Sequence, residues 1–160
     1  MLKARKASSV KSARHRSREF ALQGLYQWLL AKTEMSEIVK DIELFRGYDK
    51  CDPLYFRDLL AGAIDDAESI EGSLAPLLDR PVDKLSPIER AILTIAGCEF
   101  LRHPEVPYRV VINEAVELAK AFGGTDGYKY VNGVLDKLAV TLREPEVSDV
   151  SKARKARAAG

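Results

Sequence analysis

The stretch SPIERAILTIAGCEFL, residues 86–101, decides the fold of this 160-residue chain. Ser86, Pro87 and Glu89 form a capping box with proline at the first helical position, which predicts the start of a helix. The residues that follow are apolar on nearly every side of that helix. Because a helix that is apolar all round is a buried one, we expect it in the middle of the molecule.

The segments on either side of this helix have the pattern of amphipathic helices. Their apolar residues recur at steps of three and four, and no stretch alternates with period two for long enough to predict a strand. Asp52 can cap the preceding helix, which continues as one long stripe, and Thr125 can cap the last. The sequence predicts an all-α fold of six to seven helices, with the surrounding ones at about 14–31, 36–45, 53–77, 108–122 and 125–142.

The charge of the chain is segregated along its length. Residues 1–18 contain seven lysines and arginines and no acid, residues 152–157 contain four more, and the body between has 14 basic against 24 acidic residues. Basic ends on an acidic body predict a localised contact with a polyanion. Because both ends have few large apolar groups, we predict disordered basic tails at 1–13 and 144–160 around one domain at 14–143.

Groups for catalysis or metal binding do not gather in the sequence. His15 stands among arginines that oppose its protonation, and His103 ends a helix, where a surface or capping role is expected. Cys51 and Cys98 have no second cysteine nearby, which predicts free thiols in a reducing cytoplasm and no metal site. No segment has the pattern of a membrane helix or signal peptide. We therefore predict a cytoplasmic protein that is not an enzyme and needs no cofactor.

Arginines stand directly on the first turn of the helix predicted at 14–31. Arg14, Arg18, Leu22 and Tyr26 advance by four residues each, with a drift of about 40° per step, so the pattern puts Arg18 and Tyr26 on one side. A basic stripe that ends in an exposed aromatic suits single-stranded RNA, whose phosphates pair with guanidinium groups and whose bases stack on a ring. The alternative is a solvated helix start with Tyr26 half in the core. Positive charge at a helix N-terminus is unfavourable, which favours an anionic ligand there.

A second cluster in TDGYKYVNG, residues 125–133, has a similar character. Tyr130 can stack on a base and Lys129 can contact a phosphate, while Asp126 can accept from a base edge or cap its own helix. Asn132 and Gly133 are interpreted as packing residues, with the glycine allowing close approach of another helix.

Several stretches resemble the NusB family of bacterial transcription antitermination proteins. They are REFALQGLYQW (18–28), LYFRDLLAG (54–62), the central IERAILTIAGCEFL (88–101) and VPYRVVINEAVELAKAFGGTDGYKYVNGVLDKL (106–138). The resemblance covers about residues 14–143 and implies a helical protein of two packed bundle halves. It implies binding to the boxA element of ribosomal RNA leader transcripts. The implied partners are NusE, a small-subunit ribosomal protein, and the RNA polymerase elongation complex with other Nus factors.

The resemblance also implies which residues face the RNA. His15 interrupts what is often an unbroken arginine run, and Tyr130 stands where phenylalanine is common. We expect the guanidinium groups and the two tyrosine rings to converge on one platform, so that Arg16→Glu with Arg18→Glu weakens RNA binding without unfolding the protein. The implied RNA-facing set is Arg14, Arg16, Arg18, Tyr26, Glu89, Asp126, Lys129 and Tyr130.

The surface for the protein partner is placed, as a hypothesis, on exposed parts of the central and C-terminal helices, including Tyr55, Arg57 and Asp58. Monomer and homodimer both stay open, because long apolar stripes can pack within a chain or between chains. The alternative function is a protein-interaction module whose basic tails bind RNA nonspecifically. A shuffled RNA would then bind as tightly as a boxA RNA.

Overall fold

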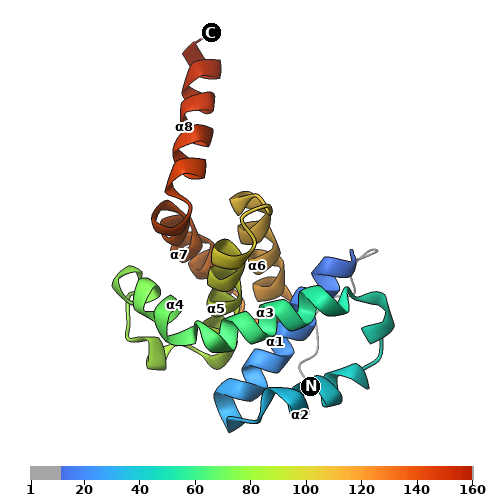
Figure 1. The fold of residues 1–160 in the computed structure, drawn as a ribbon. Helices are drawn as coiled ribbons and strands as arrows, with labels where there is room; N and C mark the ends of the chain where they lie inside the picture. The colour runs from blue at the N-terminus through green and yellow to red at the C-terminus, as the bar shows by residue number, and fades with distance from the viewer. Residues whose placement is uncertain (1–11, 160) are drawn as a thin grey trace.

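A computed structural model describes residues 12–159, and their regular structure is entirely helical (Figure 1). The all-α class is confirmed, with eight α-helices in this part of the chain instead of six to seven. None of these helices is both long and apolar enough to cross a membrane. Most of the predicted N-terminal tail, residues 1–11, lies outside the described residues. The helices are α1 (Ala13–Ala31), α2 (Met35–Glu43), α3 (Pro53–Asp65), α4 (Ala67–Leu74), α5 (Pro87–Arg102), α6 (Tyr108–Phe122), α7 (Gly127–Leu142) and α8 (Glu144–Ala159).

Helix α5 lies at the centre of the molecule, as its all-round apolar pattern predicts. Every residue from Ala91 to Phe100 is buried, and α5 packs against α1, α3, α6 and α7. The Oγ of Ser86 accepts a hydrogen bond from the N–H of Glu89 at 3.2 Å, which confirms the predicted cap. Both cysteines are free and buried. Burial raises the pKa of the Cys98 thiol to about 12.

Two groups of helices meet on α5. Helix α1 packs against α2 and α3, and α6 packs against α7, while α5 contacts both groups. Figure 1 shows α1, α2 and α3 on one side and α6 and α7 on the other. The start of α3 is capped as predicted, because the carboxylate of Asp52 accepts from the N–H of Tyr55 at 3.1 Å. The start of α7 differs from the prediction: Asp126, and not Thr125, is the residue at its N-cap.

The single helix predicted over 53–77 is divided into α3 and α4. The break falls at Asp66, whose N–H still bonds to the carbonyl of Gly62 at 2.9 Å. The carboxylate of Asp66 accepts a hydrogen bond from the Nε of Arg102 at 2.9 Å, so the end of α5 holds the junction. The break directs α4 toward α5, because Ile70 of α4 lies directly above Gly97 of α5. An ion pair with a distant helix therefore sets a boundary that the apolar stripe does not show.

The predicted disorder of the C-terminal tail is wrong for residues 144–159, which form α8. Its start is attached to the body, because the Nε of Arg143 donates to the carbonyl of Phe100 at 2.7 Å. Glu146 accepts from the N–H of Tyr108 at 2.8 Å. The first turn of α8 is acidic and its last turn is basic, which suits the helix dipole, and alanine, lysine and arginine are strong helix formers. No residue of α8 is fully buried, and only Val147 and Val150 pack against the core, which is why apolar periodicity does not reveal the helix.

Asn132 and Gly133 are both exposed, which corrects their interpretation as packing residues. No atom lies within 4 Å of a Cβ added at Gly133. We expect Gly133→Ala to raise the free energy of unfolding by about 0.5–1 kcal/mol, since glycine in a helix loses more backbone entropy on folding. Urea denaturation measures the change.

The matched control is Gly97→Ala in α5. There the added Cβ would lie 2.6 Å from the Cγ2 of Ile70, so the same chemical change is expected to lower stability. Equal effects at Gly133 and Gly97 would contradict this description of the two positions.

Candidate nucleic-acid interface

Two of the three predicted arginines lie near the surface at the start of α1. Arg14 is exposed, and its guanidinium carbon lies 4.3 Å from the centre of the Tyr55 ring, a cation–π contact. Within residues 12–159, no carboxylate forms an ion pair with Arg14. Arg16 is half-buried, and its Nη1 lies 3.7 Å from the position of a Cβ on Gly47. The Tyr55 ring therefore supports a cation whose donors remain available to an anion.

Arg18 is buried, which corrects its predicted place on the exposed basic stripe. It has 4% of its surface exposed, and Glu99 on α5 has 1%. The Nε of Arg18 donates to the two carboxylate oxygens of Glu99 at 2.9 and 3.1 Å. The hydroxyl of Tyr55 donates to the same carboxylate at 2.6 Å. Arg18→Glu would place two carboxylates together in the core, so the double substitution suggested by the sequence would test folding and not RNA binding.

Acidic residues compensate much of the positive charge at the start of α1. The Nδ1 of His15 contacts the carboxylate of Glu114, and Glu19 lies 3.7 Å from its Nε2. Arg18 lies 3.6 Å from the same Glu114. Burial raises the pKa of the Glu114 carboxyl, but the hydrogen bond to His15 and the positive charge of Arg18 together lower it by more. The pKa of Glu114 is therefore below its usual value. His15 is thus not surrounded by arginines alone, and the helix dipole does not require a ligand here.

A groove of about 470 Å³ lies beside these charges. Arg14 lines it together with apolar groups that include Pro107 and Val110, and the carboxylates of Glu105 and Glu114 line it as well. A guanidinium next to apolar surface suits a nucleotide, which has an anionic phosphate and an apolar base face.

The other predicted cluster lies at the start of α7. Glu89 is close to it, because its Oε1 is 2.8 Å from the position of a Cβ on Gly127. Lys129 and Asp126 are both exposed, with 3.5 Å between Nζ and Oδ1. Tyr130 is half-buried. The structure therefore brings together Glu89, Asp126, Lys129 and Tyr130 at one end of α5 and α7, which we call the α7 cluster.

Asp79 and Arg80 also belong at this place, and the sequence reasoning missed them. The hydroxyl of Tyr130 donates to Asp79 at 3.0 Å, and the guanidinium carbon of Arg80 lies 5.3 Å from the ring centre. Hydrogen bonds from Arg80 and then Tyr130 lower the pKa of Asp79 to about 2. The sequence shows only a turn here, because no local pattern links a loop to a side chain 51 positions away.

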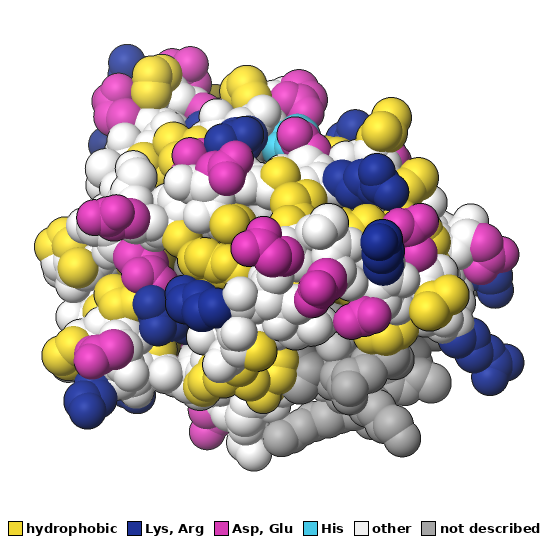
Figure 2. Space-filling view, turned by 60° about the horizontal axis from the view of Figure 1, so that its bottom comes forward, with side chains coloured by type: hydrophobic (Ala, Val, Ile, Leu, Met, Phe, Trp, Pro, Cys, Tyr) yellow, Lys and Arg dark blue, Asp and Glu magenta, His cyan; other side chains and the backbone are white. Residues whose placement is uncertain are grey.

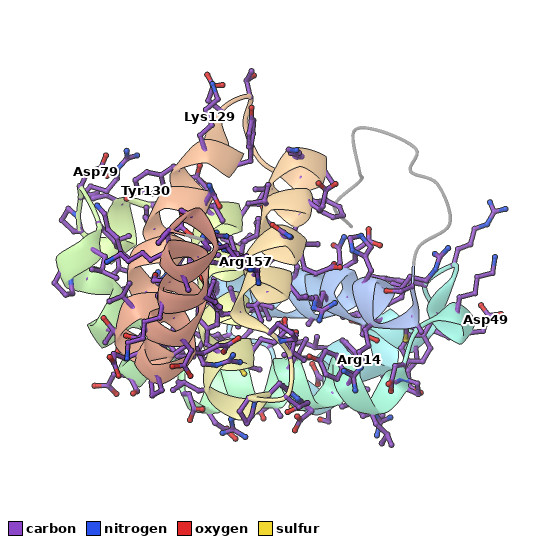
Figure 3. The ribbon with its side chains drawn as sticks, turned by 90° about the horizontal axis from the view of Figure 1, so that it is seen from above. Arg14, Asp49, Asp79, Lys129, Tyr130 and Arg157 are labelled. Carbon is purple, nitrogen blue, oxygen red and sulfur yellow. The ribbon has the colours of Figure 1, made fainter. Side chains whose placement is uncertain are left out.

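The predicted single platform does not form. Figure 3 shows Arg14 on the opposite side of the molecule from Lys129 and Tyr130. Tyr26 is half-buried, and among the described residues no ring contact joins it to Tyr130. An RNA that contacts both places must therefore run across the surface between them.

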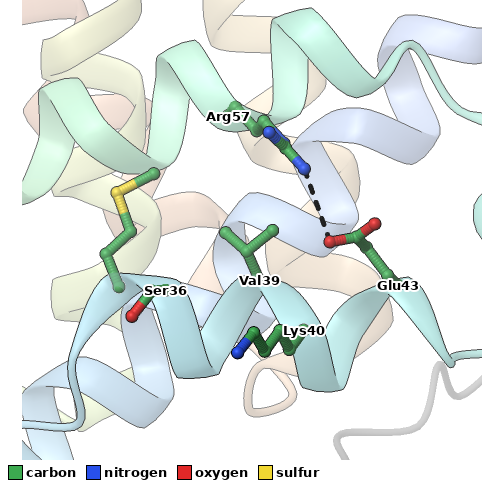
Figure 4. A pocket seen from close by; sticks show the side chains of 6 residues that line it. Ser36, Val39, Lys40, Glu43 and Arg57 are labelled. Carbon is green, nitrogen blue, oxygen red and sulfur yellow. Dashed lines mark hydrogen bonds and ion pairs between the residues drawn. The ribbon is translucent and has the colours of Figure 1, made fainter.

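The region predicted to contact the protein partner contains both buried and exposed residues. Tyr55 is buried, whereas Arg57 and Asp58 are exposed. Arg57 closes one side of a groove of about 390 Å³ between α2 and α3 by pairing with Glu43 at 3.4 Å (Figure 4). His103 is the C-cap of α5, one of the two roles expected for it, and it is buried and not on the surface, with its Nε2 2.7 Å from Asp58. Within residues 12–159, no group of three or more His, Cys, Asp or Glu side chains is placed to hold a metal ion.

Curated relatives match most of the chain. A transcription antitermination protein NusB from Paraburkholderia phymatum is 56% identical over 143 residues, which is 89% of this chain and 99% of the relative. Another, from Burkholderia cenocepacia, is 58% identical over 136 residues, which is 85% of this chain and 94% of the relative.

Solved structures match the fold. NusB of T. maritima has a TM-score of 0.73 at 30% identity, covering 81% of this chain and 92% of that one. A chain in the crystal structure of antitermination factors NusB and NusE in complex with dsRNA has a TM-score of 0.67 at 25% identity, covering 79% and 95%. The fold and these likenesses define the class as helical transcription antitermination proteins. The NusB family pattern matches residues 15–140, and the chain belongs to the NusB family.

Proposed function

We propose that this protein binds a boxA-type element of ribosomal RNA leader transcripts together with the ribosomal protein NusE, within an antitermination complex on RNA polymerase in the cytoplasm. The curated relatives are named transcription antitermination proteins, and one structural neighbour was solved with NusE and dsRNA. Of the RNA-facing residues that the family resemblance implies, Arg18 is buried, and the others are exposed or half-buried.

The proposal rests mainly on the exposure and the contacts of Arg14. It is exposed, supported by the Tyr55 ring at 4.3 Å, and without a carboxylate partner within residues 12–159. The acids nearby already contact other basic groups: Glu99 bonds to Arg18, Glu114 contacts His15, and Glu105, which lines the same groove as Arg14, contacts His103. A cation that no carboxylate bonds directly is suited to a phosphate.

The α7 cluster supplies the second part of the proposed contact. Lys129 is exposed and suits a phosphate, and the partly exposed ring of Tyr130, oriented through Asp79, suits a stacked base. Glu89 and Asp126 offer carboxylate oxygens that can accept from the amino groups of base edges. Phosphate contacts set affinity and position, and only the base contacts distinguish sequences.

The proposed partner surface is the exposed face of α3 that includes Arg57 and Asp58. This assignment rests on exposure and charge.

Titration of a labelled boxA RNA and a shuffled RNA of equal length, each with and without NusE, tests the proposal. We expect tighter binding of the boxA RNA than of the shuffled RNA, with a larger difference when NusE is present. Equal affinity for the two RNAs under both conditions would contradict the proposal and favour a protein-interaction module with nonspecific RNA binding.

A further inference from the structure

Helix α8 extends beyond the part of the chain that the family pattern matches, which ends at residue 140. Its first half is fastened, because Val147 and Val150 pack against the core and Glu146 bonds to the start of α6. Every residue from 151 to 159 is exposed. Figure 1 shows the second half of α8 projecting away from the body of the molecule.

The projecting half of α8 is purely cationic. Asp149 is the last acid in the chain, and four bases follow it: Lys152, Arg154, Lys155 and Arg157. Within residues 12–159, no acid forms an ion pair with any of the four. In contrast, Lys, Arg, Asp and Glu side chains alternate over the face of the body shown in Figure 2. The cationic end of α8 is therefore an uncompensated charge held at a distance from the body.

Helix stability alone does not account for this arrangement. Basic residues in a last turn interact favourably with the helix dipole, by about 0.3–1 kcal/mol each when close to the end. Lys152 lies more than one turn from the end, and like charges three or four residues apart are unfavourable. Four such residues on a segment that buries nothing suggest a ligand of opposite charge.

The distribution of these bases indicates what kind of contact they make. Lys152 and Lys155 are three residues apart and share one side of the helix, and Arg154 and Arg157 share another. Residues 144–160 contain no aromatic side chain that could stack on a base. Cations on several sides without a stacking ring suit phosphates, and give no means of reading the sequence.

We propose that the cationic end of α8 binds the phosphates of RNA that flanks the specifically bound element, independently of the flanking sequence. The identity of this polyanion rests on the proposed function. Lys129 and Tyr130 lie at the N-terminal end of α7 and α8 begins after its C-terminal end, so one transcript would have to span the length of α7 to contact both the cluster and the projecting helix. This second contact raises affinity for long transcripts over short ones.

The test compares a short RNA that contains only the boxA element with an RNA that carries about 20 flanking nucleotides. Two full-length variants are measured at several salt concentrations: the double variant Arg154→Gln with Arg157→Gln, and the quadruple variant that also has Lys152→Gln and Lys155→Gln. Glutamine keeps the helix propensity while removing the charge. The matched control is Lys40→Gln with Lys137→Gln, which removes two exposed charges from α2 and α7.

For the long RNA, we expect the slope of log affinity against log salt to become shallower by about 0.7 for each charge that contacts a phosphate, and so by about 1.4 in the double variant. The short RNA and the control variant should show no such change, and replacing the flanking sequence should not matter. An unchanged slope for the long RNA would overturn the inference and leave an acidic protein surface as the ligand. Equal losses for short and long RNA, or in the control variant, would overturn it as well.

This result is separable from the test of the proposed function. Equal binding of boxA and shuffled RNA, together with a shallower salt dependence of long-RNA affinity in the α8 variants, would contradict the proposed function and support the α8 contact. A preference for boxA RNA, with no change of salt dependence in the α8 variants, would support the proposed function and contradict the α8 contact.

Discussion

Glu99→Ala is expected to lower the free energy of unfolding by about 3–5 kcal/mol, because it leaves the guanidinium of Arg18 buried without its partner. Arg18 has 4% of its surface exposed and bonds to both carboxylate oxygens of Glu99. The hydroxyl of Tyr55 loses its acceptor in the same variant. Urea denaturation followed by circular dichroism measures the change.

The control for this variant is Glu43→Ala, which also removes the carboxylate partner of an arginine. Arg57 and Glu43 are 3.4 Å apart, with 52% and 41% of their side chains exposed, so this loss is expected to be below about 1 kcal/mol. If Glu99→Ala cost no more than Glu43→Ala, Arg18 would have to reach water, and its buried place in the fold would be contradicted.

Arg14→Glu with Arg16→Glu is expected to weaken binding of a boxA RNA by about 10- to 100-fold near 0.1 M salt. Two cations suited to phosphates become anions that repel them. The fold should persist, because negative charge is favourable at the N-terminus of α1 and the cation–π contact with Tyr55 is worth only about 0.5–1 kcal/mol. Fluorescence anisotropy at several salt concentrations measures the affinity and its slope.

A variant with the same change in net charge controls for long-range electrostatics. Lys40→Glu with Lys137→Glu reverses two exposed charges on α2 and α7, away from Arg14 and Arg16, and should change affinity far less. Comparable losses in the two variants would show that total charge, and not the place of Arg14 and Arg16, governs binding.

Local signals in the sequence were sufficient for the core of the fold. The caps at Asp52 and Ser86 predicted the starts of α3 and α5 correctly, and the all-round apolar pattern of residues 91–100 predicted the central place of α5. These features depend on residues within one or two turns of each other, so the sequence displays them directly. Three of the four members of the α7 cluster, Asp126, Lys129 and Tyr130, were predicted as a group because they lie within five residues of each other, whereas Glu89 came from the family resemblance.

Local signals in the sequence did not predict the contacts between distant segments. A helical repeat put Arg18 and Tyr26 on one side, but only the position of Glu99, 81 residues away, shows that Arg18 points inward. The junction at Asp66 depends on Arg102, and the orientation of Tyr130 depends on Asp79. Helix α8 was missed for a different reason: it forms through propensity and end charges, which a search for buried faces ignores.

Arg14 is exposed and Arg18 is buried, and this difference affects how the results of a genetic screen of this protein would be interpreted. If Arg14 contacts RNA as proposed, a screen for lost antitermination in cells would score substitutions at both positions alike, since neither variant would act on the transcript. The soluble amount of each variant separates them: changes at Arg14 should leave normal levels, and changes at Arg18 should deplete the protein through proteolysis. RNA-contact residues assigned from phenotype alone would therefore include Arg18, although its side chain lies in the interior of the fold.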